Sequence, residues 1–210
     1  MKSIGESDMR KLYIVFLAGL ISLMATNLTH AENYTIDTKG THAFIQFKTK
    51  HLGFSWLHGQ FNTFSGSFSY DESNSSLSKV DVEIDTRSLD SNHAKRDKHL
   101  RSGAYLDAKV FPVATFNSTS FEELGKGKAV LKGDFTLHGI TKNITLDVEH
   151  VGHGYDPWGG YRRGFTATTT IKPAEFGLKE MVKLGPHSEV VFLELAIEGI
   201  RQAYEQKVFN

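Results

Sequence analysis

The stretch AVLKGDFTLHGITKNITLDV (residues 129–148) alternates between two kinds of residue on both sides of a short glycine-containing link. One face carries Ala129, Leu131, Gly133, Phe135 and Leu137 before the link, and Ile144, Leu146 and Val148 after it. A period of two places these side chains on one face of a β-strand, and a link as short as residues 137–141 joins antiparallel neighbours. The stretch therefore predicts a β-hairpin with one apolar face.

The same alternation recurs before and after this hairpin, which brings the number of predicted strands to eight. The apolar faces of the other strands carry Ala43, Ile45, Phe47 and Thr49; Phe64, Gly66, Phe68 and Tyr70; Val80, Val82, Ile84 and Thr86; Ala114, Phe116, Ser118 and Ser120; Phe165, Ala167, Thr169 and Ile171; and Val191, Leu193, Leu195 and Ile197. The opposite faces are mostly charged or hydroxylated, which is typical of antiparallel strands with one solvated face.

Strands in this order can hide their apolar faces in two packed sheets or in a closed barrel. Small residues stand beside large phenylalanines on the inward faces, which favours a barrel with room inside. We therefore predict an all-β fold, an eight-stranded antiparallel barrel, with a fully packed sandwich or barrel as the alternative.

The N-terminal residues have the pattern of a secretory signal peptide. Arg10 and Lys11 precede an apolar run over residues 12–24, and Thr29-His30-Ala31 supplies a small-x-small cleavage site. We expect cleavage after Ala31, and the alternative is a retained N-terminal membrane anchor.

The predicted organisation is thus a signal peptide over residues 1–31 and one barrel domain over residues 32–210, with translation starting at Met1 or Met9. The chain has no cysteine, so it has neither a lipoprotein attachment point nor disulfides. Because the signal peptide directs export, we expect the mature protein in the periplasm.

The charge balance gives no support to binding of nucleic acid. Lys and Arg number 24 and Asp and Glu number 24, so the formal net charge is zero. A nucleic-acid-binding domain usually carries a clear basic excess.

A basic segment, SNHAKRDKHLRSGAYLDAKVFP (residues 91–112), interrupts the strands. Ser91 and Asn92 can cap a short helix that begins near His93. The segment is too polar for a core helix, so we expect it across the mouth of the barrel or along its outside wall. A solvated surface helix without a binding role is the alternative.

Catalytic and metal-binding patterns are weak. His150-x-x-His153 has two of the three or four ligands that a zinc site needs, and neither cysteine nor H-E-x-x-H is present. Ser188 follows His187 without a G-x-S-x-G motif, and Trp158-Gly159-Gly160 lies in a loop. We expect no metal, no cofactor and no enzymatic activity.

Several segments in one order resemble the YceI-like family of exported polyisoprenoid-binding proteins. They are YTID (34–37), HAFIQFKTKHLGFSWLHGQF (42–61), NHAKRDKHLRS (92–102), FPVATF (111–116), GDFTLHGITK (133–142) and DPWGGYRRGF (156–165). The resemblance runs from about Tyr34 to Ile200 and implies a lipocalin-like barrel, a helix near its mouth and a long apolar tunnel for an isoprenoid.

The predicted site has two parts. The tunnel lining is expected from the aromatic residues Phe47, Phe54, Trp56, Phe61, Phe64, Phe68, Phe116, Phe135 and Phe165. If the ligand has a phosphate or pyrophosphate head group, we expect it beside Arg96, His99 and Arg101, with Arg163 as a further candidate.

The expected function is to hold a polyisoprenoid, a quinone-like molecule or a related lipid as carrier or buffer, with a homodimer possible. The alternative is a stress-related periplasmic interaction protein with a packed, ligand-free barrel.

Overall fold

The structure is a computed structural model that describes residues 31–183 and 186–203. The predicted signal peptide lies outside the described residues except for Ala31. The chain from Ala31 onward makes one compact unit.

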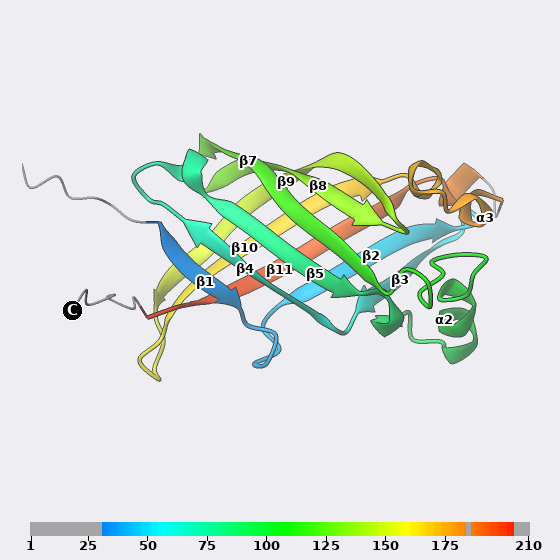
Figure 1. Ribbon diagram of the computed structural model, residues 1–210, viewed down its shortest axis with the longest axis horizontal. Helices are drawn as coiled ribbons and strands as arrows, with labels where there is room; N and C mark the ends of the chain where they lie inside the picture. Colours follow the sequence, from blue (N-terminus) through cyan, green and yellow to red (C-terminus); the bar gives the residue numbers. More distant parts are fainter. Residues whose placement is uncertain (1–30, 184–185, 204–210) are drawn as a thin grey trace, which may run out of the picture. The chain divides into compact units, whose positions relative to one another are not determined.

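Most of this unit is β-sheet (Figure 1). The strands are β1 (Glu32–Ile36), β2 (Phe44–His51), β3 (Ser55–Phe61), β4 (Phe64–Tyr70), β5 (Lys79–Asp85), β6 (Leu89–Asp90), β7 (Val113–Gly125), β8 (Lys128–Leu137), β9 (Ile140–Tyr155), β10 (Tyr161–Ile171) and β11 (Val191–Arg201).

The sheet closes on itself. The order of neighbours is β1-β4-β5-β7-β8-β9-β10-β11, and β11 pairs again with β1. β11 also pairs with β2 further along, so β1 and β2 occupy one position in the wall in succession. β3 and β4 share the next position in the wall in the same way: β4 pairs with β1, and β3 pairs with β2 and with the short β6. All these pairings are antiparallel, and the predicted eight-stranded antiparallel barrel is confirmed.

The sequence pattern does not predict β3, because the alternation of apolar and polar residues breaks down over residues 54–61. Its inward positions include Gly59, which pairs with Phe47 of β2. A Cβ at Gly59 would lie 2.2 Å from Cζ of Phe47, so the phenylalanine ring covers the glycine. The ring therefore fills the inward position that the alternation leaves without a side chain.

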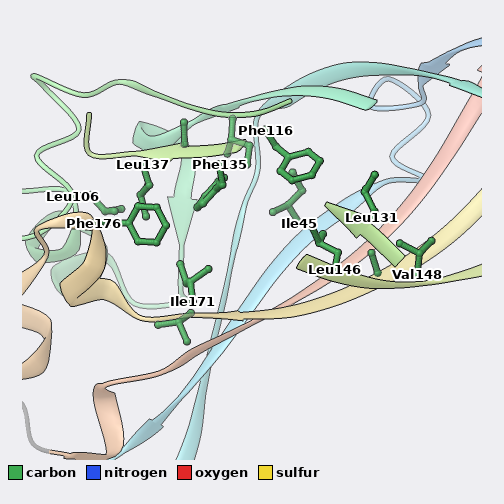
Figure 2. Packing of buried hydrophobic residues seen from close by; sticks show 14 of the residues in the cluster. Ile45, Leu106, Phe116, Leu131, Phe135, Leu137, Leu146, Val148, Ile171 and Phe176 are labelled. Atoms are coloured by element: carbon green, nitrogen blue, oxygen red, sulfur yellow. The ribbon is translucent and has the colours of Figure 1, made fainter. Parts of the chain in front are cut away.

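Inward side chains form the core (Figure 2). The larger cluster includes Phe116, Leu131, Phe135 and Leu146. A smaller cluster at the β1 end of the barrel includes Tyr34 and Phe68, Tyr34 being fully buried.

Two helical segments interrupt the strands. The basic segment forms α2 (Ala94–Leu100), as predicted, but its N-cap is His93, whose ring accepts a hydrogen bond from the backbone N–H of Arg96. A second segment, between β10 and β11, was not predicted and holds η3 (Pro173–Phe176), α3 (Lys179–Val182) and η4 (Pro186–Ser188). α2 and α3 lie at the same end of the barrel (Figure 1).

Two further 3-10 turns, η1 (Ser75–Leu77) and η2 (Thr86–Ser88), lie in connections. None of the helices that the described residues form has both the length and the apolar character needed to cross a bilayer.

Candidate functional site: an apolar cavity inside the barrel

The barrel encloses a cavity of about 510 Å³, lined almost entirely by apolar side chains. Its lining runs from Ile36 and Phe68 near β1, past Phe116 and Leu146, to Leu178 beside α3. The interior is therefore not filled from end to end.

Six of the predicted aromatic residues border this cavity: Phe47, Phe61, Phe68, Phe116, Phe135 and Phe165. Phe64 packs against the core but does not border the cavity. The geometry agrees with the predicted lining at these six positions, and their role in binding a ligand remains a prediction.

Phe54 and Trp56 do not line the cavity, and their predicted place there is wrong. Phe54 is 88% exposed, in the hairpin between β2 and β3. Trp56 packs edge-on against Phe192, with ring centroids 5.4 Å apart, and Lys50 Nζ lies 5.6 Å from its ring centroid. Trp56 belongs to the outward face of β3, opposite to Leu57 and Phe61, which border the cavity.

The cavity reaches the surface beside α2. His51 and Leu52 of the β2–β3 hairpin and His99 of α2 border the cavity and are also exposed to solvent. Arg96 and Leu100 of α2 also border it. We call this end of the barrel the mouth, and the end near β1 the closed end.

A buried carboxylate holds α2 in place at the mouth. Asp97 accepts hydrogen bonds from the backbone N–H of Ser91, at 2.9 Å, and from its hydroxyl. Burial by itself raises the pKa of Asp97, but the bonds from Ser91 and the nearby charge of Arg101 outweigh it and lower the pKa. The carboxylate is therefore ionised and keeps the start of α2 fixed.

Arg96 and His99 fit the predicted head-group position. Arg96 donates from Nε to the Ser91 hydroxyl, at 2.7 Å, and from Nη2 to the Ser91 carbonyl. Its Nη1 has no hydrogen-bond partner among the residues that the structure describes. The ring of His99 packs against Tyr105, with centroids 4.6 Å apart.

Arg101 does not border the cavity, and its predicted head-group position is wrong. Its Nη1 donates to the carbonyls of Arg87 and Leu89, at 3.1 Å each. These bonds tie the end of α2 to the chain before β6. The side chain is thus used in the structure of the mouth.

Arg163 lies at the closed end, away from Arg96, which also corrects its predicted position. Arg163 pairs with Gly199 of β11, eight residues from Val191 at the mouth end of that strand, or roughly 27 Å at strand spacing. The side chain is 2% exposed.

Two tyrosines and an exposed glutamate contact the buried Arg163. The guanidinium lies 4.2 Å from the ring centroid of Tyr70, its Nη2 pairs with Glu72, and its Nε is 3.4 Å from the Tyr34 hydroxyl. Burial, with a hydrogen bond to Glu32, raises the pKa of Tyr34 to about 12. The phenol stays neutral and Arg163 is neutralised by Glu72.

A second arginine, Arg162, forms an ion-pair network at the same end. Arg162 binds Asp156 at 2.6 Å, Asp37 at 2.7 Å and Glu198 at 2.5 Å. Hydrogen bonds from His42 and Arg162 lower the pKa of Asp37 to about 2. The network joins the β1–β2 and β9–β10 connections to β11.

The side chains of Asp37, His42 and Glu198 are close enough together for a metal ion. Arg162 already supplies the cation in this cluster, binding both carboxylates. The arrangement is therefore that of an ion-pair network.

His150, His153 and Ser188, which the sequence analysis considered for metal binding or catalysis, contact neighbouring residues of the fold. His153 Nδ1 lies 3.2 Å from His150 Nε2, and burial, followed by the charge of Arg163, lowers the pKa of His150. The Ser188 hydroxyl donates to the carbonyl of Met181 at 2.9 Å.

Sequence reasoning missed several residues that border the cavity near the mouth, among them His51, Leu52, Leu178 and Met181. Leu178 and Met181 stand three residues apart, which is a helical spacing, and this was the available signal. His51 continues the inward face of β2 after Phe47 and Thr49.

Comparison with known proteins identifies the family. The model of the YceI-like domain matches residues 34–198. The chain belongs to the YceI-like family. Relatives of this YceI-like protein include a UPF0312 protein of Vibrio vulnificus, 52% identical over 189 residues, which are 90% of this chain and 98% of the relative. A UPF0312 protein of Shewanella baltica is 48% identical over 194 residues, 92% of this chain and all of the relative.

Solved structures share the fold of this YceI-like protein. A YCEI protein of Campylobacter jejuni is 27% identical, with a TM-score of 0.67 over 73% of this chain and 90% of that one. BcnA of Burkholderia cenocepacia is 20% identical, with a TM-score of 0.68 over 78% and 98%. A polyisoprenoid binding domain from Saccharophagus degradans is 15% identical, with a TM-score of 0.59 over 80% and 98%.

Proposed function

We propose that this YceI-like protein binds an isoprenoid or a similar lipid inside its barrel, as a carrier or a buffer. The observation that carries the proposal is the apolar cavity of about 510 Å³, which reaches solvent beside α2. Small-molecule sites are typically cavities of about 300–1,000 Å³ with mostly apolar walls and a few polar groups.

The chemistry of the lining favours a hydrocarbon chain. Each buried methylene contributes about 0.8 kcal/mol, so one isoprene unit contributes roughly 3–4 kcal/mol before the cost of association. The cavity wall is almost entirely apolar, as at Phe116 and Leu146, and offers mainly contacts of this kind. A chain of several units therefore needs no strong polar contact there.

The mouth supplies the polar contact for a head group. Nη1 of Arg96 has no hydrogen-bond partner within residues 31–183 and 186–203, and His99 and His51 border the cavity nearby. Guanidinium binds phosphate oxygens strongly, and a histidine adds positive charge in acid. A phosphate or pyrophosphate at the mouth, with its tail inside, is the ligand that this arrangement favours.

The similarity in fold to a protein named as a polyisoprenoid binding domain supports the same class of ligand. We place the protein in the periplasm, because residues 1–31 have the pattern of a cleaved signal peptide. We propose a binding protein without catalytic activity, since no acid and base are paired beside the cavity among the described residues.

The alternative, an interaction protein with a packed barrel, has less support because the interior holds a cavity. Native mass spectrometry of protein taken gently from the exported fraction separates the two functions. A bound mass in the range of a lipid is the expected result. A ligand-free mass after mild handling, and no uptake of a polyprenyl phosphate or a quinone, would contradict the proposal.

A further inference from the structure

The hairpin between β2 and β3 presents apolar side chains to solvent at the mouth. Leu52 is 51% exposed and Phe54 is 88% exposed. Trp56, just beyond the turn on the outward face of β3, is 45% exposed. Large apolar side chains gathered on one exposed projection are typical of a surface that contacts another apolar phase.

The tip of this hairpin is held in one conformation. The backbone N–H of Phe54 donates to the carbonyl of His51 at 2.9 Å, and Gly53 has a φ of 81°. A Cβ at Gly53 would lie 2.8 Å from Nε2 of His187, so the ring of His187 packs directly behind the turn. Phe54 is therefore projected by a supported turn.

Basic side chains surround the apolar tip. Residues 48–58 and 91–110, the hairpin and the α2 segment, contain seven lysines and arginines against two aspartates, Asp97 and Asp107. Asp97 is buried against Ser91. Lys50, Lys95 and Lys98 form no ion pair with any residue in the described ranges.

The other charged groups at the mouth cancel only part of this charge, and Asp90, which directly precedes the α2 segment, contributes one negative charge. Lys48 pairs with Glu194, and this pair is neutral. The segment 172–190 carries three lysines and three glutamates and adds no net charge. The basic excess thus belongs to the hairpin and to α2, the two elements that border the mouth.

We propose that the β2–β3 hairpin and α2 dock the mouth onto an anionic lipid bilayer, with Phe54, Leu52 and Trp56 entering the interface. Lysines near a surface of anionic lipids are attracted to it, and aromatic side chains prefer the interface between head groups and acyl chains. Lys50, which has no ion pair among the described residues, lies with its Nζ 5.6 Å from the Trp56 ring centroid, so both kinds of contact can form together.

The purpose of such docking rests on the proposed function, because a lipid could then pass between bilayer and cavity without crossing water. The cavity lining includes Leu52 of the hairpin and His99 of α2, so the docking surface borders its opening.

The two tryptophans make the orientation measurable. Trp56 lies beside the mouth, and Trp158 is 81% exposed in the β9–β10 connection at the closed end. The Trp158→Phe variant keeps Trp56 as its only fluorescent tryptophan, and the Trp56→Phe variant keeps only Trp158. The whole chain is expressed, and the protein is mixed with vesicles of phosphatidylglycerol and phosphatidylcholine whose acyl chains carry bromine.

Bromine is expected to quench Trp56 strongly and to leave Trp158 unchanged. Equal quenching of both reporters, or quenching of Trp158 alone, would overturn the proposal. So would a lack of binding to these vesicles at low salt.

A second pair of variants tests the contact itself. Phe54→Ser is expected to lower vesicle affinity about tenfold, because it removes one large apolar side chain from the interface. Trp158→Ser removes an equally exposed aromatic residue from the closed end and should leave affinity unchanged. The same affinity in both variants would contradict the proposed surface.

Native mass spectrometry of Phe54→Ser keeps the two proposals apart. Phe54 does not border the cavity, so lipid occupancy should stay as in the unmodified protein. If Phe54→Ser loses binding to vesicles and still holds lipid, the docking surface is supported. If the unmodified protein binds vesicles but never holds lipid, the docking surface is still supported and the proposed function is contradicted.

Discussion

The two ends of the barrel use arginine and lysine in opposite ways. At the closed end, Arg162, Arg163 and Arg201 each pair with carboxylates, and Arg163 is almost fully buried. At the mouth, one guanidinium nitrogen of Arg96 has no hydrogen-bond partner in the part of the chain that the structure describes, and the lysines of α2 face solvent. Neutralised cations stabilise the fold, whereas cations without partners remain able to bind an anionic group that arrives from outside.

The largest effect on stability is expected from Arg163→Ala. It removes the contact with Tyr70 and the pair with Glu72 and leaves a space at the buried end. We expect the free energy of unfolding to fall by about 2–3 kcal/mol. Urea denaturation measures this change, and Arg96→Ala at the mouth is the matched control, with an expected loss of at most about 1 kcal/mol. Equal losses would remove the contrast between the two ends.

A smaller and pH-dependent effect is expected from Asp37→Asn. The pKa of Asp37 is lowered to about 2 from 3.8, so its ionised form stabilises the folded state by about 2 kcal/mol at neutral pH. This stabilisation is complete above the unfolded pKa and is lost as the pH falls from about 4 to about 2. Urea denaturation should show a large difference between the two proteins at pH 7 and a much smaller one near pH 2, where about half of the folded protein has Asp37 protonated. A constant difference would show that the charge of Asp37 is not its cause.

The mouth is expected to matter more for ligand than for folding. Arg96→Ala should weaken binding of a polyprenyl phosphate about tenfold, equivalent to about 1.4 kcal/mol, by removing a charge-assisted hydrogen bond. Binding of an uncharged isoprenoid of the same length should change little. Fluorescence titration of both ligands measures this, with Arg101→Ala as a control whose side chain binds backbone carbonyls. Equal weakening for the two ligands would contradict a head-group role for Arg96.

The barrel could be predicted because its apolar residues recur with a period of two, as in residues 129–148. β3 could not, because the alternation fails there: its inward Gly59 lies under Phe47, and its outward Trp56 is aromatic. Because Trp56 is a large aromatic residue on an outward face, it was wrongly predicted to line the cavity.

The site was only partly predictable, for a related reason. Strand periodicity predicts five of the six phenylalanines that border the cavity, and the sixth, Phe61, lies on the unpredicted β3. Which arginine lies at which end depends on how strands far apart in the chain pair, such as β10 with β11. The partner of a basic side chain, Glu72 for Arg163 or the Leu89 carbonyl for Arg101, is also set by this long-range pairing.

Blocking the cavity tests the central claim most directly. Ala167 borders the cavity, and its neighbour Thr168 points outward on the same strand. Ala167→Phe and Thr168→Phe therefore add a similar ring to the inside and to the outside of β10. With folding checked by circular dichroism and urea denaturation, the lipid-stripped proteins are mixed with polyprenyl phosphate and weighed by native mass spectrometry. We predict that Ala167→Phe loses most of the bound lipid and Thr168→Phe keeps it; full occupancy in a folded Ala167→Phe would show that the lipid does not bind inside the barrel.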